Sequence, residues 1–304
     1  MKSNKRVCAL GFFDGVHLGH GKIIKEAVSL AASLGAGPAV ITFDRRPKSF
    51  ILGTADRLIS PGRAKEKLIS LMFSGTELIT IPFNAGVASL SPEDFVNGLL
   101  IGQFGACGAA AGLDHRFGKD ALGDINTLSG LIKTSPVPTV ELDGVKVSST
   151  NIRGALSAGD FELALAYLGH PFLLGGKVEH GDGRGHNIGF ATLNLPYDKA
   201  QLYPAEGVYA SVAEIDGKLY PGVTNLGHRP TFYDDGIFTN ETHLIGCSPD
   251  LYSKEVWLWL CGYIRPERRF DSAAELKVQV DEDIAASIKI TENCSFFAEI
   301  LRRN

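Results

Sequence analysis

Two histidines lie three residues apart in the stretch GFFDGVHLGH, residues 11–20. The stretch separates a short apolar run from a helical pattern, so His17 and His20 are expected on one face of a first helical turn, near the positive end of the helix dipole. Gly15 and Gly19 allow backbone N–H groups to approach an anionic ligand closely. A metal site would need a third ligand at a recognisable spacing. The pattern therefore favours phosphate binding over metal ligation, and over the solvated-loop or buried-core roles that a single histidine usually has.

The elements that must position these histidines follow an alternating pattern over the first half of the chain. Short apolar runs alternate with helical periodicity from residue 7 to about residue 150, which predicts a parallel sheet covered by helices. The periodic segment from Gly19 to Leu34 ends at a glycine, as helices commonly do. A second helix is predicted from Ser91 through Leu100. The predicted strands are VCALG (7–11), AVITF (39–43), ELITIPF (77–83) and ACGAAAG (106–112).

The second half has a different pattern, of short β-branched and aromatic runs separated by Gly, Pro and Asp-Gly. YASVAEI and KLYPGVT, joined at Asp216-Gly217, give a strong hairpin signal. These runs predict a small antiparallel barrel or sandwich. The spacing of apolar residues from Ser272 to Leu301 predicts one or two helices lying across it.

The length of 304 residues corresponds to about two domains. Residues 151–168 read as a helix that precedes a Gly-His-Pro sequence. We place the domain boundary there, which gives domains of residues 1–170 and 171–304. With 44% hydrophobic and 21% charged residues, both domains can bury sizeable cores.

The composition disfavours several classes of protein. A formal net charge of −4 without a basic block disfavours binding to nucleic acid or to a membrane surface. Five scattered cysteines, none in a C-x-x-C pair, indicate neither a disulfide framework nor a zinc site. We expect neither an export signal nor a membrane span, because no segment reaches about 18 uninterrupted apolar residues. The scattered cysteines fit a protein of the reducing cytoplasm. We expect a monomer or weak oligomer.

Several motifs in order along the first half resemble one known family. GFFDGVHLGH is similar to the H-x-G-H signature of the nucleotidyltransferase superfamily, in the G-x-F-D-G-V-H-x-G-H form of the prokaryotic bifunctional riboflavin kinase/FAD synthetases. Later motifs of that family's FMN-adenylylating domain follow in order: GLDHRFG (112–118), GD (123–124), SSTNIR (148–153) and GD (159–160) before LGHPF. The resemblance implies an α/β, Rossmann-like nucleotidyltransferase domain.

The second half resembles the flavokinase domain of the same family. The matching motifs are HGDGRGHNIGFATLN (180–194), NLGHRPTF (225–232), ETH (241–243) and IRPERRF (264–270). The resemblance thus covers nearly the whole chain, and it implies a small antiparallel β-barrel domain with a C-terminal helix. The sequence has no G-x-x-x-x-G-K-[ST] run, so a kinase activity here would not depend on a Walker A loop.

The resemblance implies that the first domain transfers an adenylyl group from ATP to FMN. Such a transfer requires in-line positioning and stabilisation of negative charge on the α-phosphoryl group, without a covalent intermediate. His17 and His20 would supply that stabilisation together with the helix N-terminus. Hydroxyls and one cation in residues 148–153 suit the ATP phosphates, although S-S-T by itself is as often a helix cap. The implied nucleotide contacts of this domain are Gly11, Phe13, Asp14, Gly19, Asp114, Ser148, Ser149, Thr150 and Arg153.

The resemblance implies that the second domain phosphorylates a ribityl hydroxyl of riboflavin with ATP. Glu241 resembles the general base for that hydroxyl. Thr192 and Asn194 share one face of a predicted strand, and their oxygens suit Mg²⁺. A Gly-rich run would cover the phosphates, although such a run alone is more often a turn. The implied nucleotide contacts are Gly181, Gly183, Arg184 and Gly189, and the implied flavin contacts are Asn225, Arg229, Arg265 and Phe270.

Three departures from the family pattern concern sites in both domains. Phe12 stands where the family usually has Asn, Arg45-Arg46 replace a usual Pro-His, and the usual P-T-A-N reads ATLN (191–194). The expected function is the ATP- and Mg²⁺-dependent conversion of riboflavin to FMN and of FMN to FAD. Two alternatives stay open: a divergent member with one of the two activities, and a non-catalytic sensor that binds flavin or nucleotide.

Overall fold

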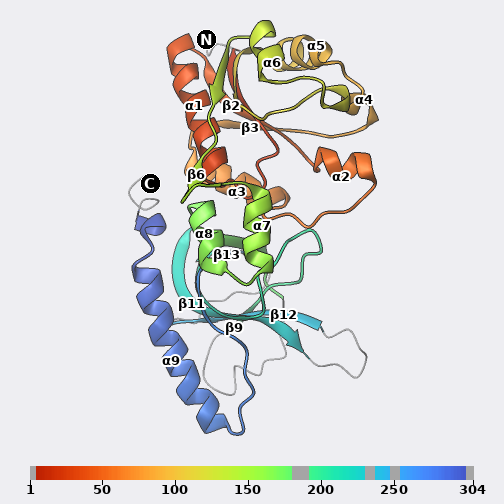
Figure 1. Cartoon of the computed structure of the whole chain (residues 1–304). Coiled ribbons are helices and arrows are strands. Elements are labelled where there is room, and N and C mark those ends of the chain that lie inside the picture. Colours follow the sequence, from red (N-terminus) through yellow and green to blue (C-terminus); the bar gives the residue numbers. More distant parts are fainter. Residues whose placement is uncertain (1–4, 180–191, 230–236, 247–253, 299–304) are drawn as a thin grey trace. The chain divides into compact units, whose positions relative to one another are not determined.

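The computed structural model describes residues 5–179, 192–229, 237–246 and 254–298 (Figure 1). The chain forms two compact units, Met1–Asn151 and Ile152–Asn304. This division lies earlier than the boundary near residue 170 that the sequence predicts. The segment between the two positions includes a helix that packs on strands of the second unit, as described below, and the boundary near residue 170 stays a prediction.

A five-stranded parallel sheet forms the centre of the first unit, in the order β3-β2-β1-β4-β5. Its strands are β1 (Arg6–Leu10), β2 (Gly37–Phe43), β3 (Glu77–Ile81), β4 (Ala106–Gly112) and β5 (Thr134–Val137). The first four confirm the strands predicted from the sequence. The strand order reverses at β1, and open sheets of this kind bind ligands beyond the carboxyl ends of the strands at such a point. GFFDGVHLGH begins there.

Helix α1 (Leu18–Leu34) follows that stretch and confirms the predicted first helix. It buries Ile24, Ala27 and Ala31 and ends at Gly35, whose φ of 61° suits a residue without a side chain. The other helices of this unit are α2 (Pro47–Leu52), α3 (Gly62–Met72), α4 (Ala85–Ala88), α5 (Pro92–Asp94), η1 (Phe95–Gln103, a π-helix), η2 (Lys119–Ala121) and α6 (Ile125–Leu131). A two-stranded ribbon of β6 (Glu141–Leu142) and β7 (Val145–Lys146) completes it.

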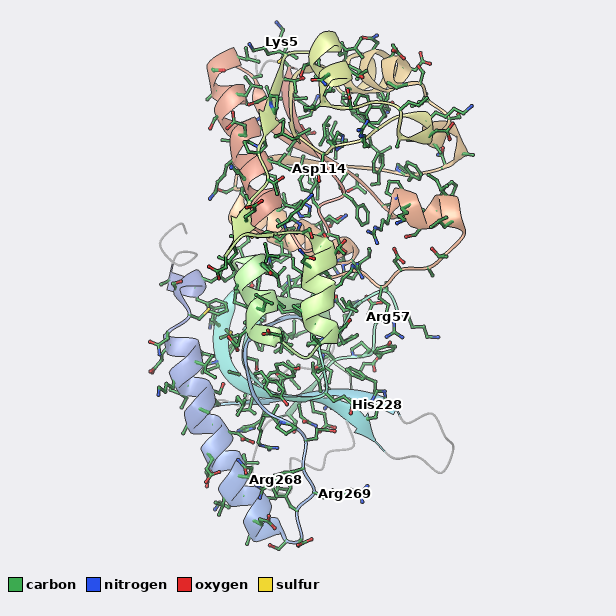
Figure 2. The ribbon with its side chains drawn as sticks, viewed as in Figure 1. Lys5, Arg57, Asp114, His228, Arg268 and Arg269 are labelled. Atoms are coloured by element: carbon green, nitrogen blue, oxygen red, sulfur yellow. The ribbon has the colours of Figure 1, made fainter. Side chains whose placement is uncertain are left out.

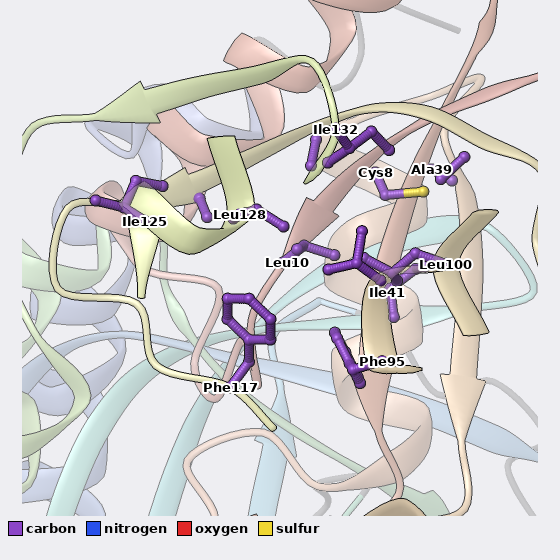
Figure 3. Packing of buried hydrophobic residues seen from close by; sticks show 14 of the residues in the cluster. Cys8, Leu10, Ala39, Ile41, Phe95, Leu100, Phe117, Ile125, Leu128 and Ile132 are labelled. Carbon is purple, nitrogen blue, oxygen red and sulfur yellow. The ribbon is translucent and has the colours of Figure 1, made fainter. Parts of the chain in front are cut away.

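One hydrophobic cluster of the first unit packs the sheet against η1 and α6 (Figure 3). Fully burying a side chain of this size contributes about 1.5–3 kcal/mol, so the cluster holds the ends of β1 and β2 firmly in place. Its members include Cys8, Leu10, Ala39, Ile41, Phe95, Leu100, Phe117, Ile125, Leu128 and Ile132.

A six-stranded antiparallel sheet forms the second unit, in the order β8-β13-β10-β11-β12-β9. Glu179, beyond the end of one edge strand, forms a bridge with Asn194 in the other edge strand, so the sheet curls into the predicted small barrel. Asp216 (φ 50°) and Gly217 (φ 77°) make the predicted hairpin turn. The strands are β8 (Phe172–Lys177), β9 (Thr192–Asn194), β10 (Gly207–Ile215), β11 (Lys218–Arg229), β12 (Ile237–Leu244) and β13 (Glu255–Arg265).

The single helix predicted for residues 151–168 is wrong, because the structure has two helices there. Helix α7 (Ser149–Ser157) ends before Gly159, whose φ is 75°, and α8 (Phe161–Leu168) begins after Asp160. The side chain of Asp160 accepts a hydrogen bond from the N–H of Leu163 and so caps α8. Helix α8 packs on the barrel, with the Phe161 ring 5.0 Å from that of Tyr209.

Helix α9 (Ala273–Glu292) confirms the C-terminal helix within the segment predicted from Ser272 onward. Ser272 caps it by accepting from the N–H of Glu275. Ser287 Oγ donates to the carbonyl oxygen of Gly222 at 2.7 Å, which anchors the helix to β11. Residues of the barrel strands and of α9 together line a cavity of this unit.

Candidate active sites

His17 and His20 meet at the N-terminus of α1. His17 precedes the helix as its cap, and its Nδ1 accepts a hydrogen bond from the backbone N–H of His20 at 3.3 Å. The two rings stack with their centres 3.5 Å apart. The prediction that both imidazoles lie on one face at this end is therefore confirmed, with His17 just outside the first turn.

The surroundings of His20 hold its ring in the neutral form. Burial lowers the pKa of His20 well below its usual value, and the nearby His17 and Lys65 lower it further. Nδ1 of His20 is buried and has no hydrogen-bond partner among the residues that the structure describes. A neutral imidazole at a helix N-terminus can donate one N–H to an anionic group beside the backbone N–H groups.

The turn between β1 and α1 is strained and closely packed. Phe13 has a φ of 55° and Val16 a φ of 42°, both costly for residues with side chains. The carboxylate of Asp14 accepts from the N–H of Ser60 at 3.0 Å, and the hydroxyl of Ser60 accepts from the N–H of Gly15 at 2.7 Å. Such strain persists only where the surrounding contacts fix it, and it is common at ligand sites.

Two glycines of the motif are needed for space. A side chain at Gly19 would place its Cβ 3.2 Å from the ring of His17. A side chain at Gly11 would place its Cβ 3.0 Å from the ring of Phe13. Both positions therefore keep the rings where they lie, which is a packing role in addition to the nucleotide contacts predicted for these glycines.

The structure brings part of the segment 148–153 to this turn. Ser149 Oγ donates to the carbonyl oxygen of Asp14 at 3.0 Å. Ser148 Oγ accepts from the N–H of Asn151 at 3.2 Å, so it caps α7 as the alternative interpretation of S-S-T expected. Thr150 is exposed, and Arg153 follows on the same helix, past the division between the units.

Asp114 lies after β4, and its side chain is exposed (Figure 2). Lys146 on β7 donates to its carboxylate and is the main cause of the lowered pKa of Asp114. No described contact joins this carboxylate to His17 or His20. Its predicted role in positioning a nucleotide stays a prediction.

A cavity of about 720 Å³ opens beside the carboxyl end of β1, starting at Leu10 and Gly11. Its wall is mostly apolar, and three of its aromatic rings contact one another edge to face. The Phe83 ring lies 5.0 Å from that of Phe43 and 5.5 Å from that of Phe50. Such a wall suits a flat aromatic ligand. The aromatic residues that line it are Phe43, Phe50, Phe83, Phe95, His115 and Phe117.

Sequence reasoning did not predict this cavity. The aromatic residues come from five separate segments, and each one alone reads as ordinary core packing. His115 and Phe117 belong to GLDHRFG, which was noted only as a motif. Their stacked rings, 5.8 Å apart, are the local signal that could have pointed to an aromatic wall.

Arg45 and Arg46 do not reach the histidine pair through any described contact. The Arg45 side chain is 59% exposed and pairs with Asp44. Arg46 pairs with Asp56 at 3.0 Å.

The second unit contains a cavity of about 280 Å³ between the barrel and α9. The strand register explains why distant residues meet there, because Glu241 pairs with Asn225 on one side and with Asn194 on the other, while His243 pairs with Thr192. Side chains at alternate positions of a strand share a face. Of the predicted residues, this cavity is lined by Thr192, Asn225, Glu241, Arg265 and Phe270.

The wall of this cavity includes charged residues that sequence reasoning missed. Arg265 makes a bidentate pair with Asp283 on α9, through three contacts of 2.7, 2.9 and 3.2 Å. Asn225 Nδ2 donates to Glu267 at 2.7 Å. The Arg268 guanidinium, labelled in Figure 2, lies 4.7 Å from the centre of the Phe270 ring. Arg268 and Glu267 are part of IRPERRF, so that motif carried a signal for them.

Several predicted residues of the second half lie outside the described residues. These are Gly181, Gly183, Arg184 and Gly189, together with Ala191. The backbone of Arg229 ends β11, while its side chain is not described. Within the described ranges, no group of three or more His, Cys, Asp or Glu side chains could hold a metal ion.

Comparisons with known proteins match the two units separately. The model of the FAD synthetase family matches residues 1–151, and that of the riboflavin kinase family matches residues 168–291. A bifunctional riboflavin kinase/FMN adenylyltransferase of Bacillus subtilis (strain 168) is 38% identical over 299 residues, covering 95% of this chain and 93% of the relative. One from Pseudomonas fluorescens is 34% identical, covering 92% and 91%.

A solved structure gives the same overall chain fold. The crystal structure of a protein from Streptococcus pneumoniae, described there as a macrolide-efflux protein, superposes with a TM-score of 0.82. It is 29% identical and covers 94% of this chain and 95% of its own. In the part of the present chain that the structure describes, no helix is long and apolar enough to cross a membrane.

Proposed function

Because the chain belongs to the family of bifunctional riboflavin kinases/FMN adenylyltransferases, we propose that it makes FMN from riboflavin and then FAD from FMN. The observation that carries this proposal is that each matched family model lies within one unit, and each unit has its own lined cavity. ATP is the co-substrate of both steps. The proposed partners are riboflavin, FMN and ATP, without nucleic acid or membrane, for a cytoplasmic monomer or weak oligomer.

In the first unit, a phosphate oxygen of FMN attacks the α-phosphorus of ATP, and pyrophosphate leaves. Negative charge grows on the α-phosphoryl oxygens during this exchange, so donors fixed in advance lower its barrier. The N-terminus of α1, together with His17 and the neutral ring of His20, is such a set of donors. The aromatic cavity that begins at Gly11 is the proposed place of the isoalloxazine ring, because it opens at the carboxyl end of β1, where the motif that carries those donors begins.

In the second unit, the primary hydroxyl of the ribityl chain attacks the γ-phosphorus of ATP, and ADP leaves. Glu241 is the proposed base that takes the hydroxyl proton, and it lies half-buried in the wall of the cavity. Arg265, fixed by its bidentate pair with Asp283, and the ring of Phe270 are the proposed contacts of the flavin. An arginine held in this way loses little conformational entropy when it binds.

Thr192 and Asn194 are the proposed holders of Mg²⁺. The two residues occupy alternate positions of β9, so their hydroxyl and amide oxygens face the same side. In the register, Asn194 pairs with Glu241 and Thr192 pairs with His243. The oxygens of Thr192 and Asn194 are donors that suit a hard cation. When bound, Mg²⁺ supplies positive charge to the phosphate oxygens of ATP. Leu193 between them is fully buried, so its side chain anchors the strand.

A time course of riboflavin, FMN and FAD with excess Mg-ATP tests the proposal, started once from riboflavin and once from FMN. FMN that appears and then gives way to FAD is the expected result. FMN that accumulates without FAD would leave only the kinase activity. Flavin binding without any product would support the non-catalytic sensor instead.

A further inference from the structure

Lys65 is a buried lysine that none of the steps above uses. It lies in α3, and only 5% of its surface is exposed. Lysine is almost never fully buried unless its charge is paired, because removing an ammonium from water is costly. The contacts that keep it there lead to GFFDGVHLGH.

The ammonium of Lys65 is held by the turn after β1 and by the end of β2. Its Nζ donates to the carbonyl oxygen of Phe12 at 2.8 Å and to Thr42 Oγ1 at 3.3 Å. Thr42 Oγ1 donates to the same carbonyl at 2.8 Å. Nζ also lies 4.0 Å from the centre of the Phe12 ring, where a cation is attracted to the aromatic face.

These contacts fix the peptide group that precedes the strained part of the turn. The Phe12 carbonyl belongs to the peptide that joins Phe13, whose φ is 55°. The ring of Phe13 in turn packs edge-on against that of His20, with centres 5.1 Å apart. A continuous set of contacts therefore runs from the ammonium of Lys65 to the imidazole of His20.

The charged and titratable groups around this ammonium come from four segments. They are Asp14 in the turn, Asp44 after β2 and Glu66 on α3, together with His20 at the start of α1. Burial lowers the pKa of Lys65 to about 8, although the three carboxylates oppose the change. In the other direction, the charge of Lys65 helps to lower the pKa of His20.

We propose that Lys65 is a positioning residue for adenylyl transfer, which fixes the turn through the Phe12 carbonyl and so holds the His20 ring in place. The inference rests on the proposed adenylylation at the histidine pair. Lys65 acts through the turn and through His20, because its two described hydrogen bonds go to Phe12 and Thr42 and its side chain is buried. It is a functional cation kept at a cost in stability.

The pH dependence of stability and of activity should run in opposite directions. A lysine whose pKa is about 8 when folded and about 10.5 when unfolded destabilises the folded chain below pH 8, and this cost disappears as the pH rises through that window. The adenylylation rate should instead fall above pH 8 as the charge is lost. A purely structural role would make both quantities change together.

The test measures FAD formation from FMN between about pH 4 and 10, in the full chain and in three variants. Lys65→Met removes the charge, Lys65→Arg keeps it, and Lys67→Met removes a lysine from the same helix as the matched control. We expect Lys65→Met to lower kcat/KM for FMN on the order of tenfold at pH 7.5. The acid limb of its pH profile should move to higher pH. Its profile should no longer show the fall in activity near pH 8, because the charge that titrates there is absent. Lys65→Arg should retain the charge-dependent activity above pH 8.

Riboflavin phosphorylation by the same samples is the internal control, and it should be equal in all four proteins. A histidine NMR titration measures the pKa of His20 directly and should show a rise in Lys65→Met only. The proposal is overturned if Lys65→Met keeps the wild-type profile, or if the pKa of His20 does not move. If Lys65→Met does not fold, Lys65→Arg tests the proposal instead. Activity that persists above pH 8, with an unchanged pKa of His20, supports the proposal, and a fall in activity above pH 8 like that of the wild type overturns it. Should the wild-type chain make no FAD, the proposed function fails, while the titration still tests the link between Lys65 and His20.

Discussion

Two side chains in separate units are assigned to separate steps. His20 lies at the N-terminus of α1, and Glu241 lies in β12 within the barrel cavity. Neither has a described contact with the other's cavity. Each one can therefore be removed without a direct effect on the other step.

We expect His20→Ala to lower the rate of FAD formation from FMN by about 10²–10³-fold, the usual cost of removing a fixed donor from a charge-stabilising site. Riboflavin phosphorylation by this variant should stay at the wild-type rate. Glu241→Gln should show the reverse, with phosphorylation lowered by about 10²–10⁴-fold, the usual contribution of a general base. Chromatography of the products from each starting flavin measures both rates. If one variant lost both products, the assignment of one step to each unit would be wrong.

The residues that sequence reasoning placed correctly belong to short continuous motifs. His17 and His20 are three residues apart, and their ring contact follows from that spacing. Lys65 could not be predicted in this way, because its partner Phe12 is 53 residues away. Only the packing of α3 against the ends of β1 and β2 brings them together.

The strands of the barrel are joined internally by a chain of hydroxyl groups. Thr224 Oγ1 on β11 donates to Ser211 Oγ on β10 at 2.8 Å, and it lies 2.8 Å from Thr242 Oγ1 on β12. All three side chains are fully buried. Thr242 directly follows Glu241, so this chain of hydroxyls holds the strand that carries the proposed base.

We expect Thr224→Val to destabilise the second unit by about 1–3 kcal/mol, because it leaves buried hydroxyls on two strands without their partner. Thr224→Ser keeps the hydroxyl and is the control. Both tryptophans of the chain, Trp257 and Trp259, lie on β13, so tryptophan fluorescence during urea unfolding reports this unit. A Thr224→Val transition at the wild-type urea concentration would contradict the expected role.

Whether an element could be predicted depended on turn and cap residues close to it in the sequence. Asp216-Gly217 marked the hairpin because a tight turn of that kind needs positive φ at both residues. The break between α7 and α8 has a similar signal, in a glycine followed by the capping Asp160, but the apolar periodicity on both sides favoured one helix. The aromatic cavity had a local signal only in His115 and Phe117, because β2, α2, η1 and a second loop supply the other aromatic residues of its wall.

The two cavities have separate linings, which bears on how FMN passes from one step to the next. Every described residue of the larger cavity belongs to the first unit, and every one of the smaller belongs to the second. On the proposed assignment of one step to each cavity, FMN leaves the smaller cavity before its phosphate meets the histidine pair. Release into solution is the simplest route that uses only these two sites.

A mixture of His20→Ala and Glu241→Gln proteins tests that route on the whole molecule. Each variant retains one step, so the mixture should convert riboflavin to FAD, with a lag that shortens as the total protein concentration rises. Wild-type chain at the same site concentration is the control, and it should show a similar lag because its own FMN also passes through solution. A wild-type chain that forms FAD without a lag, beside a mixture that forms almost none, would mean that FMN is handed over without release. One series of time courses distinguishes release of FMN from direct transfer. Each variant alone is included as a control, because it shows that its remaining site works.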